Sequence, residues 1–177
     1  MPPLIAITGL AGSGKSTIAR VLTEHYYYQR VRFADPLKRM LSALGLSHAE
    51  LDGDLKETPS QLLLGATPRH AMQTLGTEWG RNLIGQDIWT TTWKGIVRTE
   101  VQRGYKVVCD DLRFLNEAVA VRALGGEIWS VRRPGVEMRF SHQSEAEMSR
   151  ISFDKRFTND AAIGDLVKLV RKAVGNG

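Results

Sequence analysis

Short apolar segments alternate with longer amphipathic ones along this chain. Five runs rich in strand-forming residues predict β-strands at Leu4–Thr8, Val31–Phe33, Lys106–Cys109, Glu127–Val131 and Arg156–Thr158. Strands that alternate with helices are typical of a mainly parallel sheet covered on both faces. The pattern therefore predicts an α/β fold, a three-layer α/β/α sandwich around a mainly parallel five-stranded sheet.

Helical spacing of apolar positions fills the stretches between these strands. The predicted helices cover Lys15–His25, Asp35–Leu44, a segment beginning at Pro68, residues 86–103, Phe114–Leu124 and a last helix from Ile163 to Val174. For the second helix, Asp35 is the expected N-cap, Pro36 is the first helical residue, and Gly45 ends it.

The helix beginning at Pro68 contains two residues that do not favour helices. Its apolar positions, among them Trp79, are spaced for one buried face, yet Gly76 and Gly80 interrupt it. We expect a bend or a close approach of the backbone at these glycines. The preceding residues 45–67 carry Gly, Asp, Pro and Ser and are expected to be rich in loops.

Composition narrows the class of protein. The chain has 177 residues, 42% of them hydrophobic, which allows one globular domain with a sizeable core. No apolar run has the length of a membrane span, and the first residues lack the pattern of a secretory signal. The single cysteine, Cys109, excludes an internal disulfide and is expected to be a packed thiol. We therefore expect a cytoplasmic protein with no membrane partner.

The net charge of +5 fits either a nucleic-acid surface or pockets that hold several phosphates. The distribution favours the second interpretation, because no block of five or more basic residues occurs. Arginines scattered along the chain can converge on a small anionic ligand. A stable nucleic-acid complex is not expected.

Residues 9–16, here called the phosphate loop, fit the pattern G-x-x-x-x-G-K-[ST]. Glycines let the backbone curl so that N–H groups point at phosphate oxygens, and the following helix adds the positive end of its dipole. Lys15 would reach the outer phosphates, and the Ser16 hydroxyl would bind Mg²⁺. The candidate residues for binding ATP are Gly9, Ala11, Gly12, Ser13, Gly14, Lys15, Ser16 and Thr17. Switches, motors and kinases all use this loop, so it does not determine the reaction.

Two carboxylates, Asp110 and Asp111, follow the apolar run at residues 106–109. An acidic strand end is the usual second magnesium-binding element of such proteins. Because consecutive strand residues point to opposite faces, at most one of the two is expected to serve the metal, and the other can cap the next helix. Which one does so is left open. Arg113 follows in the crevice where ligands of such sheets bind.

The chain resembles the phage-type deoxynucleoside monophosphate kinases, within the wider nucleoside monophosphate kinase group. The matching segments are the phosphate loop, Phe33–Lys38, Thr67–Arg69 with Gln73 and Leu75–Glu78, Asp111–Phe114 with Asn116–Glu117, Arg133–Gly135, His142 with Ser144–Glu145, and Thr158–Asp160. They recur in order across nearly the whole chain. The phosphate loop alone is generic, whereas Asp-x-Arg-Phe-x-Asn-Glu combined with the late His-x-Ser-Glu is much more specific.

The resemblance implies a division of the single kinase domain into three regions. The core would comprise residues 1–34, 104–131 and 151–177, the monophosphate-binding region residues 35–103, and the lid residues 132–150. ATP would be the phosphoryl donor, with Mg²⁺, and the product a deoxynucleoside diphosphate for dNTP supply. A homodimer is compatible with the resemblance, and a phage-encoded protein would work in the host cytoplasm.

The resemblance also implies roles for individual residues. On the acceptor side it implies Asp35, Arg69, Gln73 and Arg113. Further candidates for binding the acceptor are Lys38, Asp111 and Trp79, whose ring could stack on a base. Lys15, Arg113, Arg132 and Arg133, with Arg139 beside them, would act on the transferring phosphates, and Asn159 would lie near the donor base. Without the resemblance, Arg69 and Gln73 could equally be a solvated helix face, and Trp79 a core residue.

Three other functions remain as alternatives. A nucleotide-dependent switch would be expected to carry an Asn-Lys-x-Asp segment if it read guanine, and the chain has none. A nucleic-acid-stimulated ATPase would show a steep salt dependence. A P-loop kinase of another small acceptor, such as dephospho-coenzyme A, differs only in the acceptor-side residues.

Overall fold

The chain forms two compact units in the computed structural model, which describes residues 1–136 and 147–175. Unit 1 comprises residues 1–33 and 94–177, and unit 2 comprises residues 34–93. The long helix α5 (Ile88–Gln102) begins in unit 2 and ends in unit 1. The monophosphate-binding role expected of residues 35–103 stays a prediction.

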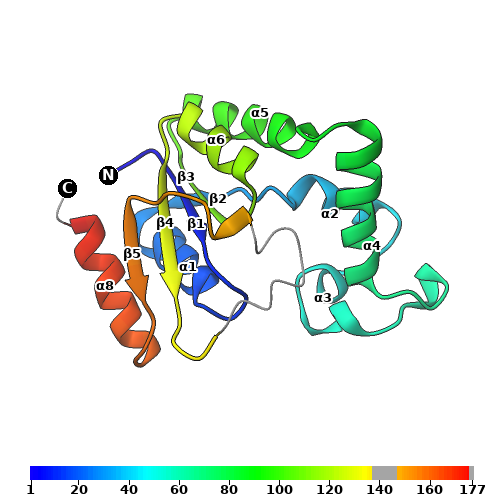
Figure 1. The fold of residues 1–177 in the computed structure, drawn as a ribbon, viewed down its shortest axis with the longest axis horizontal. Helices are drawn as coiled ribbons and strands as arrows, with labels where there is room; N and C mark the ends of the chain where they lie inside the picture. Colours follow the sequence, from blue (N-terminus) through cyan, green and yellow to red (C-terminus); the bar gives the residue numbers. More distant parts are fainter. Residues whose placement is uncertain (137–146, 176–177) are drawn as a thin grey trace. The chain divides into compact units, whose positions relative to one another are not determined.

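Unit 1 is built around one sheet, whose described strands are all parallel. The central strand β1 (Leu4–Thr8) pairs with β3 (Lys106–Leu112) on one side and β4 (Glu127–Arg132) on the other. The edges are β2 (Tyr28–Arg30) and β5 (Lys155–Thr158), giving the order β2-β3-β1-β4-β5 (Figure 1). The predicted α/β fold with a five-stranded parallel sheet is confirmed.

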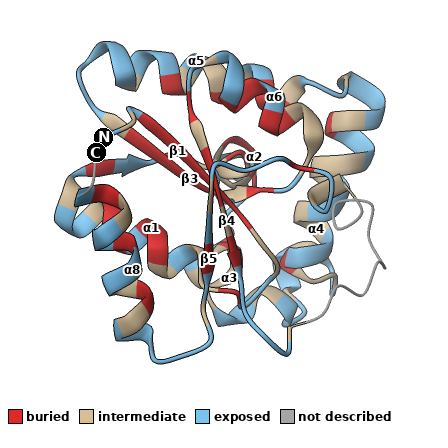
Figure 2. Ribbon diagram, turned by 60° about the vertical axis from the view of Figure 1, so that its left-hand side comes forward, coloured by how far each residue is buried: buried red, intermediate tan, exposed pale blue. Residues whose placement is uncertain are grey.

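Helices cover both faces of this sheet. As a result, every residue of its central strand β1 is buried. Helices α1 (Lys15–Tyr26) and α8 (Ile163–Gly175) lie on one face, and α6 (Leu115–Ala123) lies on the other (Figure 2). The core on the α1 side includes Ile5, Ile7, Ile18, Leu22, Trp129, Val131, Phe157, Leu166 and Val170. No helix among the described residues is both long and apolar enough to span a membrane.

The strand predicted at Val31–Phe33 is wrong in position, because the chain enters the sheet three residues earlier. Tyr27 takes a left-handed conformation (φ 59°) that ends α1 abruptly, and Tyr28 already begins β2. The Phe33 N–H donates to the Asp111 carboxylate, at 3.0 Å, instead of pairing with a strand. The apolar pattern of residues 31–33 therefore marks buried side chains beyond the strand end and not the strand itself.

Unit 2 is helical and has a core of its own. Its elements are α2 (Asp35–Ala43), α3 (His48–Leu51), η1 (Asp54–Glu57), η2 (Gln61–Leu63), α4 (Pro68–Thr74) and η3 (Leu75–Ile84). Leu37, Leu41, Leu46 and Leu51 pack with Trp89 to form this core. The expectation that Asp35 is the N-cap of α2 is wrong by one residue, because Asp35 lies in the first turn and Ala34 precedes it.

The helix that begins at Pro68 changes its hydrogen bonding at Leu75. From there η3 is a π-helix, a wider form that is rare at this length. A Cβ at Gly80 would lie 2.5 Å from the ring of Trp89, whose indole N–H donates to the Gly76 carbonyl oxygen at 2.8 Å. The close backbone approach predicted here is confirmed at Gly80, where only a glycine leaves room for the indole.

Gly80→Ala is expected to lower the free energy of unfolding by about 1–3 kcal/mol, because its methyl group would overlap the Trp89 ring in a packed core. Urea unfolding measures this. Gly95→Ala is the matched control: Gly95 lies in α5 with open space at its Cβ position, and the exchange should stabilise the protein by roughly 0.5–1 kcal/mol. Equal effects of the two substitutions would contradict the packing described here.

Candidate functional site

The phosphate loop connects β1 to α1 through three glycines in left-handed or extended positive-φ conformations. Gly9, Gly12 and Gly14 have φ values of 148°, 75° and 110°. At Gly9 the loop passes so close to β4 that a Cβ would lie 2.3 Å from the Val131 carbonyl oxygen. Helix α1 begins at Lys15, and its N-cap Gly14 has no side chain to cap it. The positive end of the helix dipole therefore lies at the loop. This backbone geometry fits the binding of phosphate groups.

Lys15 stands at the first position of α1 and folds back over the loop. Its Nζ donates to the carbonyl oxygens of Gly9 and Leu10, both at 2.7 Å. Burial and, to a smaller extent, the positive charge of Arg113 lower the pKa of Lys15 from 10.5 to about 8, against the opposing charges of Asp110 and Asp111. The structure thus brings Lys15, Arg113 and both aspartates within electrostatic range of one another.

The two aspartates lie inside β3 and not beyond it, because the strand continues to Leu112. The pairing of β1 with β3 shifts by one residue between Ala6↔Cys109 and Thr8↔Leu112, so β3 contains one extra residue at Asp110–Asp111. Such an irregularity re-aims side chains. The regular alternation of side chains from which we expected at most one aspartate to face the metal is interrupted at these two residues.

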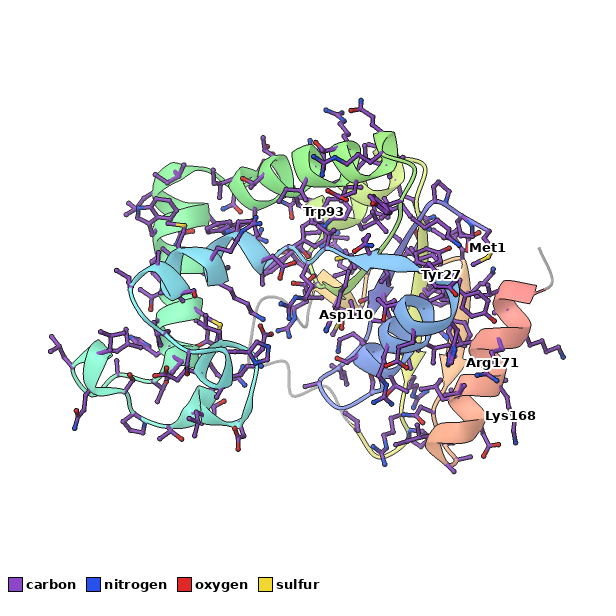
Figure 3. All side chains as sticks on the ribbon, turned by 180° about the vertical axis from the view of Figure 1, so that it is seen from behind. Met1, Tyr27, Trp93, Asp110, Lys168 and Arg171 are labelled. Carbon is purple, nitrogen blue, oxygen red and sulfur yellow. The ribbon has the colours of Figure 1, made fainter. Side chains whose placement is uncertain are left out.

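The aspartates have different partners. Asp110 is buried, lies beside β2 (Figure 3), and accepts two hydrogen bonds from Arg30, one of them from Nε at 2.8 Å. Asp111 is half-buried and accepts from the Phe33 N–H and the Cys109 thiol. The Asp110 charge is thus neutralised by a bidentate guanidinium. Arg30 was not singled out by the sequence, because it lies on an edge strand whose position was misjudged.

The residues at this edge fit a magnesium ion that binds together with phosphates. Mg²⁺ takes one or two carboxylates and keeps several waters, so it needs no cage of protein ligands. The described residues contain no group of three or more His, Cys, Asp or Glu that could form such a cage. The exposed Ser16 hydroxyl at the start of α1 and one carboxylate of the Asp110–Asp111 pair would hold the ion.

Arg113 is exposed just beyond β3, and its backbone is held in place by a buried carboxylate. The Glu117 side chain accepts from the N–H groups of Arg113, at 2.9 Å, and Phe114, at 3.1 Å. This gives a physical reason for the Asp-x-Arg-Phe-x-Asn-Glu spacing: the glutamate at the start of α6 fixes the turn that presents the arginine.

Three other candidate residues lie near the ends of β4 and β5. Arg132 ends β4 and Arg133 follows it, both with exposed side chains. Asn159 follows β5, and its side-chain amide donates to the Ser13 carbonyl oxygen of the phosphate loop at 3.0 Å. The remaining lid candidates Arg139, His142 and Ser144–Glu145 lie outside the described residues.

The acceptor-side candidates of unit 2 lie on α2, α4 and η3, and two of them are paired with carboxylates. Lys38 Nζ lies 2.5 Å from the Asp52 carboxylate, and Arg69 pairs with Glu57 of η1. Asp35 lies in the first turn of α2, and Gln73 is exposed on α4. Trp79 is 37% exposed and its ring lies 6.1 Å from that of Trp89. Trp79 is therefore neither a core residue nor fully exposed.

Comparison with known proteins identifies the family. Residues 65–170 match the family model of deoxynucleotide monophosphate kinase. A protein of Acanthamoeba polyphaga mimivirus named "Putative deoxynucleotide monophosphate kinase" is 33% identical over 187 residues, which cover 98% of this chain and 96% of that protein. The chain belongs to the deoxynucleotide monophosphate kinase family. It is accordingly a nucleotide kinase, with the resemblance seen in its sequence confirmed.

Solved structures support the fold of this family member. Shikimate kinase from Aquifex aeolicus is 14% identical with a TM-score of 0.54, covering 98% of this chain and 96% of that one. A sugar kinase from Janibacter sp. is 11% identical with a TM-score of 0.53, covering 97% and 94%. At these identities the likeness shows a shared P-loop kinase fold and says nothing of the substrate.

The lowered pKa of Lys15 predicts opposite pH dependences of nucleotide affinity and stability. Bound phosphates favour the charged ammonium, so MgATP affinity should be constant below about pH 8 and fall above it. Between about pH 8 and 10.5 the unfolded chain holds more protons at this lysine than the folded one, so its contribution to stability should rise with pH.

Calorimetric titration with MgATP and urea unfolding between pH 7 and 9.5 measure the two effects. Lys15→Met is the control, because it removes the titrating group. The difference between wild type and Lys15→Met isolates the lysine from other groups. An affinity that rises with pH in this range, or a stability difference that falls, would contradict the description of Lys15.

Proposed function

We propose that this chain transfers the γ-phosphoryl group of ATP to a deoxynucleoside monophosphate and releases ADP and the deoxynucleoside diphosphate. The observation that supports this most is the cluster of Lys15, Asp110, Asp111 and Arg113 at the carboxyl ends of β1 and β3. Ligands of open parallel sheets bind outside these strand ends, where the strand order reverses. Membership of the family supplies the nucleotide as substrate class.

Phosphoryl transfer requires alignment and charge neutralisation more than covalent help from the protein. The N–H groups of the phosphate loop and the Lys15 ammonium would hold the outer phosphates of ATP. Mg²⁺ would neutralise charge between the donor phosphates. An oxygen of the acceptor phosphate then forms a bond to the γ-phosphorus while the bond to the β-phosphate oxygen breaks. The acceptor oxygen is already ionised at neutral pH, so no general base is needed.

Arginines supply the remaining charge in this proposal. Arg113 would contact the acceptor phosphate, because it stands at the end of β3 beside Lys15. Arg132 and Arg133 would stabilise the transferring group from the end of β4. The acceptor nucleotide would bind to residues of unit 2, with the partly exposed Trp79 stacking on its base: Asp35, Lys38, Arg69, Gln73 and Trp79.

The test is magnesium- and ATP-dependent ADP release, with identification of the product, across the four deoxynucleoside monophosphates and their ribose forms. The proposal predicts a diphosphate product from one or more deoxy forms. Dephospho-coenzyme A and single-stranded DNA are included as competing acceptor and activator. Turnover only with dephospho-coenzyme A, or ADP release stimulated by DNA without a diphosphate product, would refute the proposed reaction.

Arg113→Ala is expected to lower kcat/KM for the monophosphate by roughly 100-fold, because it removes a charge that the transition state requires. The dissociation constant for MgATP should change by no more than about threefold, since the phosphate loop itself is intact. Steady-state kinetics with both substrates varied measures the difference.

Arg103→Ala is the matched control, because Arg103 forms an exposed pair with Glu100 and precedes β3, whereas Arg113 follows the opposite end of that strand. It should leave both constants unchanged. Unchanged turnover of every monophosphate in Arg113→Ala would show that the acceptor site has been assigned wrongly.

A further inference from the structure

Asn159 joins three segments that are far apart in the sequence. Its backbone N–H donates to the Arg132 carbonyl oxygen, at 2.8 Å, at the end of β4. Its side-chain Nδ2 donates to the Ser13 carbonyl oxygen, at 3.0 Å, inside the phosphate loop. Asn159 itself follows β5. One residue thus ties the loop to the strand end from which Arg132 and Arg133 extend.

The contact with the loop is close as well as hydrogen-bonded. A Cβ built on Gly14 would lie 2.9 Å from Asn159 Nδ2 and 3.0 Å from Leu166 Cδ2 of α8. The side chains of Asn159 and Leu166 therefore pack directly against the loop backbone where α1 begins. The loop is supported from this side by the β5–α8 region, which the sequence pattern does not link to it.

The direction of one phosphate-binding group follows from this contact. The Ser13 carbonyl and the Gly14 N–H belong to the same peptide plane, and in a planar trans peptide the two groups point in opposite directions. No cis peptide bond occurs among the residues that the structure describes. Holding the Ser13 oxygen against Asn159 therefore turns the Gly14 N–H away from Asn159.

We propose that Asn159 is a positioning residue that aims the Gly14 N–H at the donor phosphates. It acts through the loop backbone and makes no contact with the donor base. This inference rests on the proposed function only in that the phosphate loop binds the phosphates of ATP. It replaces the role of a base contact that the family resemblance implied for Asn159.

Two variants separate these roles. Asn159→Asp keeps the shape of the side chain but replaces the donor with a carboxylate that cannot donate to the Ser13 oxygen. Asn159→Ala removes the side chain without adding charge, and it keeps the test valid if the aspartate variant folds poorly. Asp160→Ala changes the exposed neighbouring residue and is the matched control.

The measurement is calorimetric titration of the wild type and each variant with MgATP, MgGTP and magnesium tripolyphosphate, which has no base. Both Asn159 variants should weaken the binding of MgATP and of tripolyphosphate by the same factor, roughly 5- to 30-fold, the effect of a lost hydrogen bond with its carbonyl left unpaired. The ratio of MgATP to MgGTP affinity should stay unchanged. Asp160→Ala should bind all three as the wild type does.

Four outcomes would overturn the proposal. Weaker MgATP binding with unchanged tripolyphosphate binding would show a base contact, as would a changed ratio of MgATP to MgGTP affinity. Unchanged binding of every ligand would show that Asn159 does not position the loop. A merely structural defect would lower the binding stoichiometry and the Tm while leaving the dissociation constants alone. Wild-type protein that binds MgATP and tripolyphosphate but phosphorylates no monophosphate would refute the proposed reaction and leave this inference standing.

Discussion

The close passage of the phosphate loop beside β4 is the constraint on which the rest of unit 1 depends. At Gly9 the backbone has no room for a side chain, because the Val131 carbonyl occupies the place of a Cβ. The loop can therefore curl directly from the centre of the sheet into α1. Its N–H groups and the N-terminus of α1 are placed at the carboxyl ends of β1 and β3 as a result. Within unit 1, the charges of Asp110, Asp111 and Arg113 act on Lys15 beside this turn.

The charges at this edge oppose one another in a way that favours an anion. Lys15 is half-buried, both desolvation and the charge of Arg113 disfavour its positive charge, and its ammonium donates to two loop carbonyl oxygens. The charges of Asp110 and Asp111 offset this in part, and Arg30 binds both carboxylate oxygens of Asp110. A bound polyphosphate would supply negative charge where these cations meet.

Local sequence was sufficient to predict most of the elements and the phosphate loop. The glycines of the phosphate loop and the lysine that follows them lie within eight residues of one another. The loop can therefore be recognised without knowledge of any contact between distant segments. The strand predicted at residues 31–33 lies three residues too late, because Tyr27 ends α1 in a left-handed backbone conformation that tyrosine rarely adopts. Arg30 was missed for the same reason. The extra residue in β3 depends on pairing with β1 and could not be seen in the doubled aspartate alone.

The contacts between segments far apart in the chain could not be predicted from the sequence. Nothing in the neighbourhood of Asn159 indicates that it bonds to Ser13, since the two residues meet only when β4 and β5 have joined the sheet. In unit 2, the acidic partners of Lys38 and Arg69 come from the loop-rich stretch 45–67, which carried no motif. The residues of the acceptor side were found by resemblance to the family and not by local pattern, and their roles stay proposals.

The most direct test of the account is hydrogen exchange with and without a bisubstrate analogue, adenosine joined to a deoxynucleoside through five phosphates, in the presence of Mg²⁺. If the phosphate loop binds the donor and unit 2 binds the acceptor, exchange should slow both in residues 9–20 and in the segments that carry Asp35, Lys38, Arg69 and Gln73. Slower exchange in the loop alone, with unit 2 unaffected by the second nucleoside, would contradict the assignment of unit 2 as the acceptor-binding part.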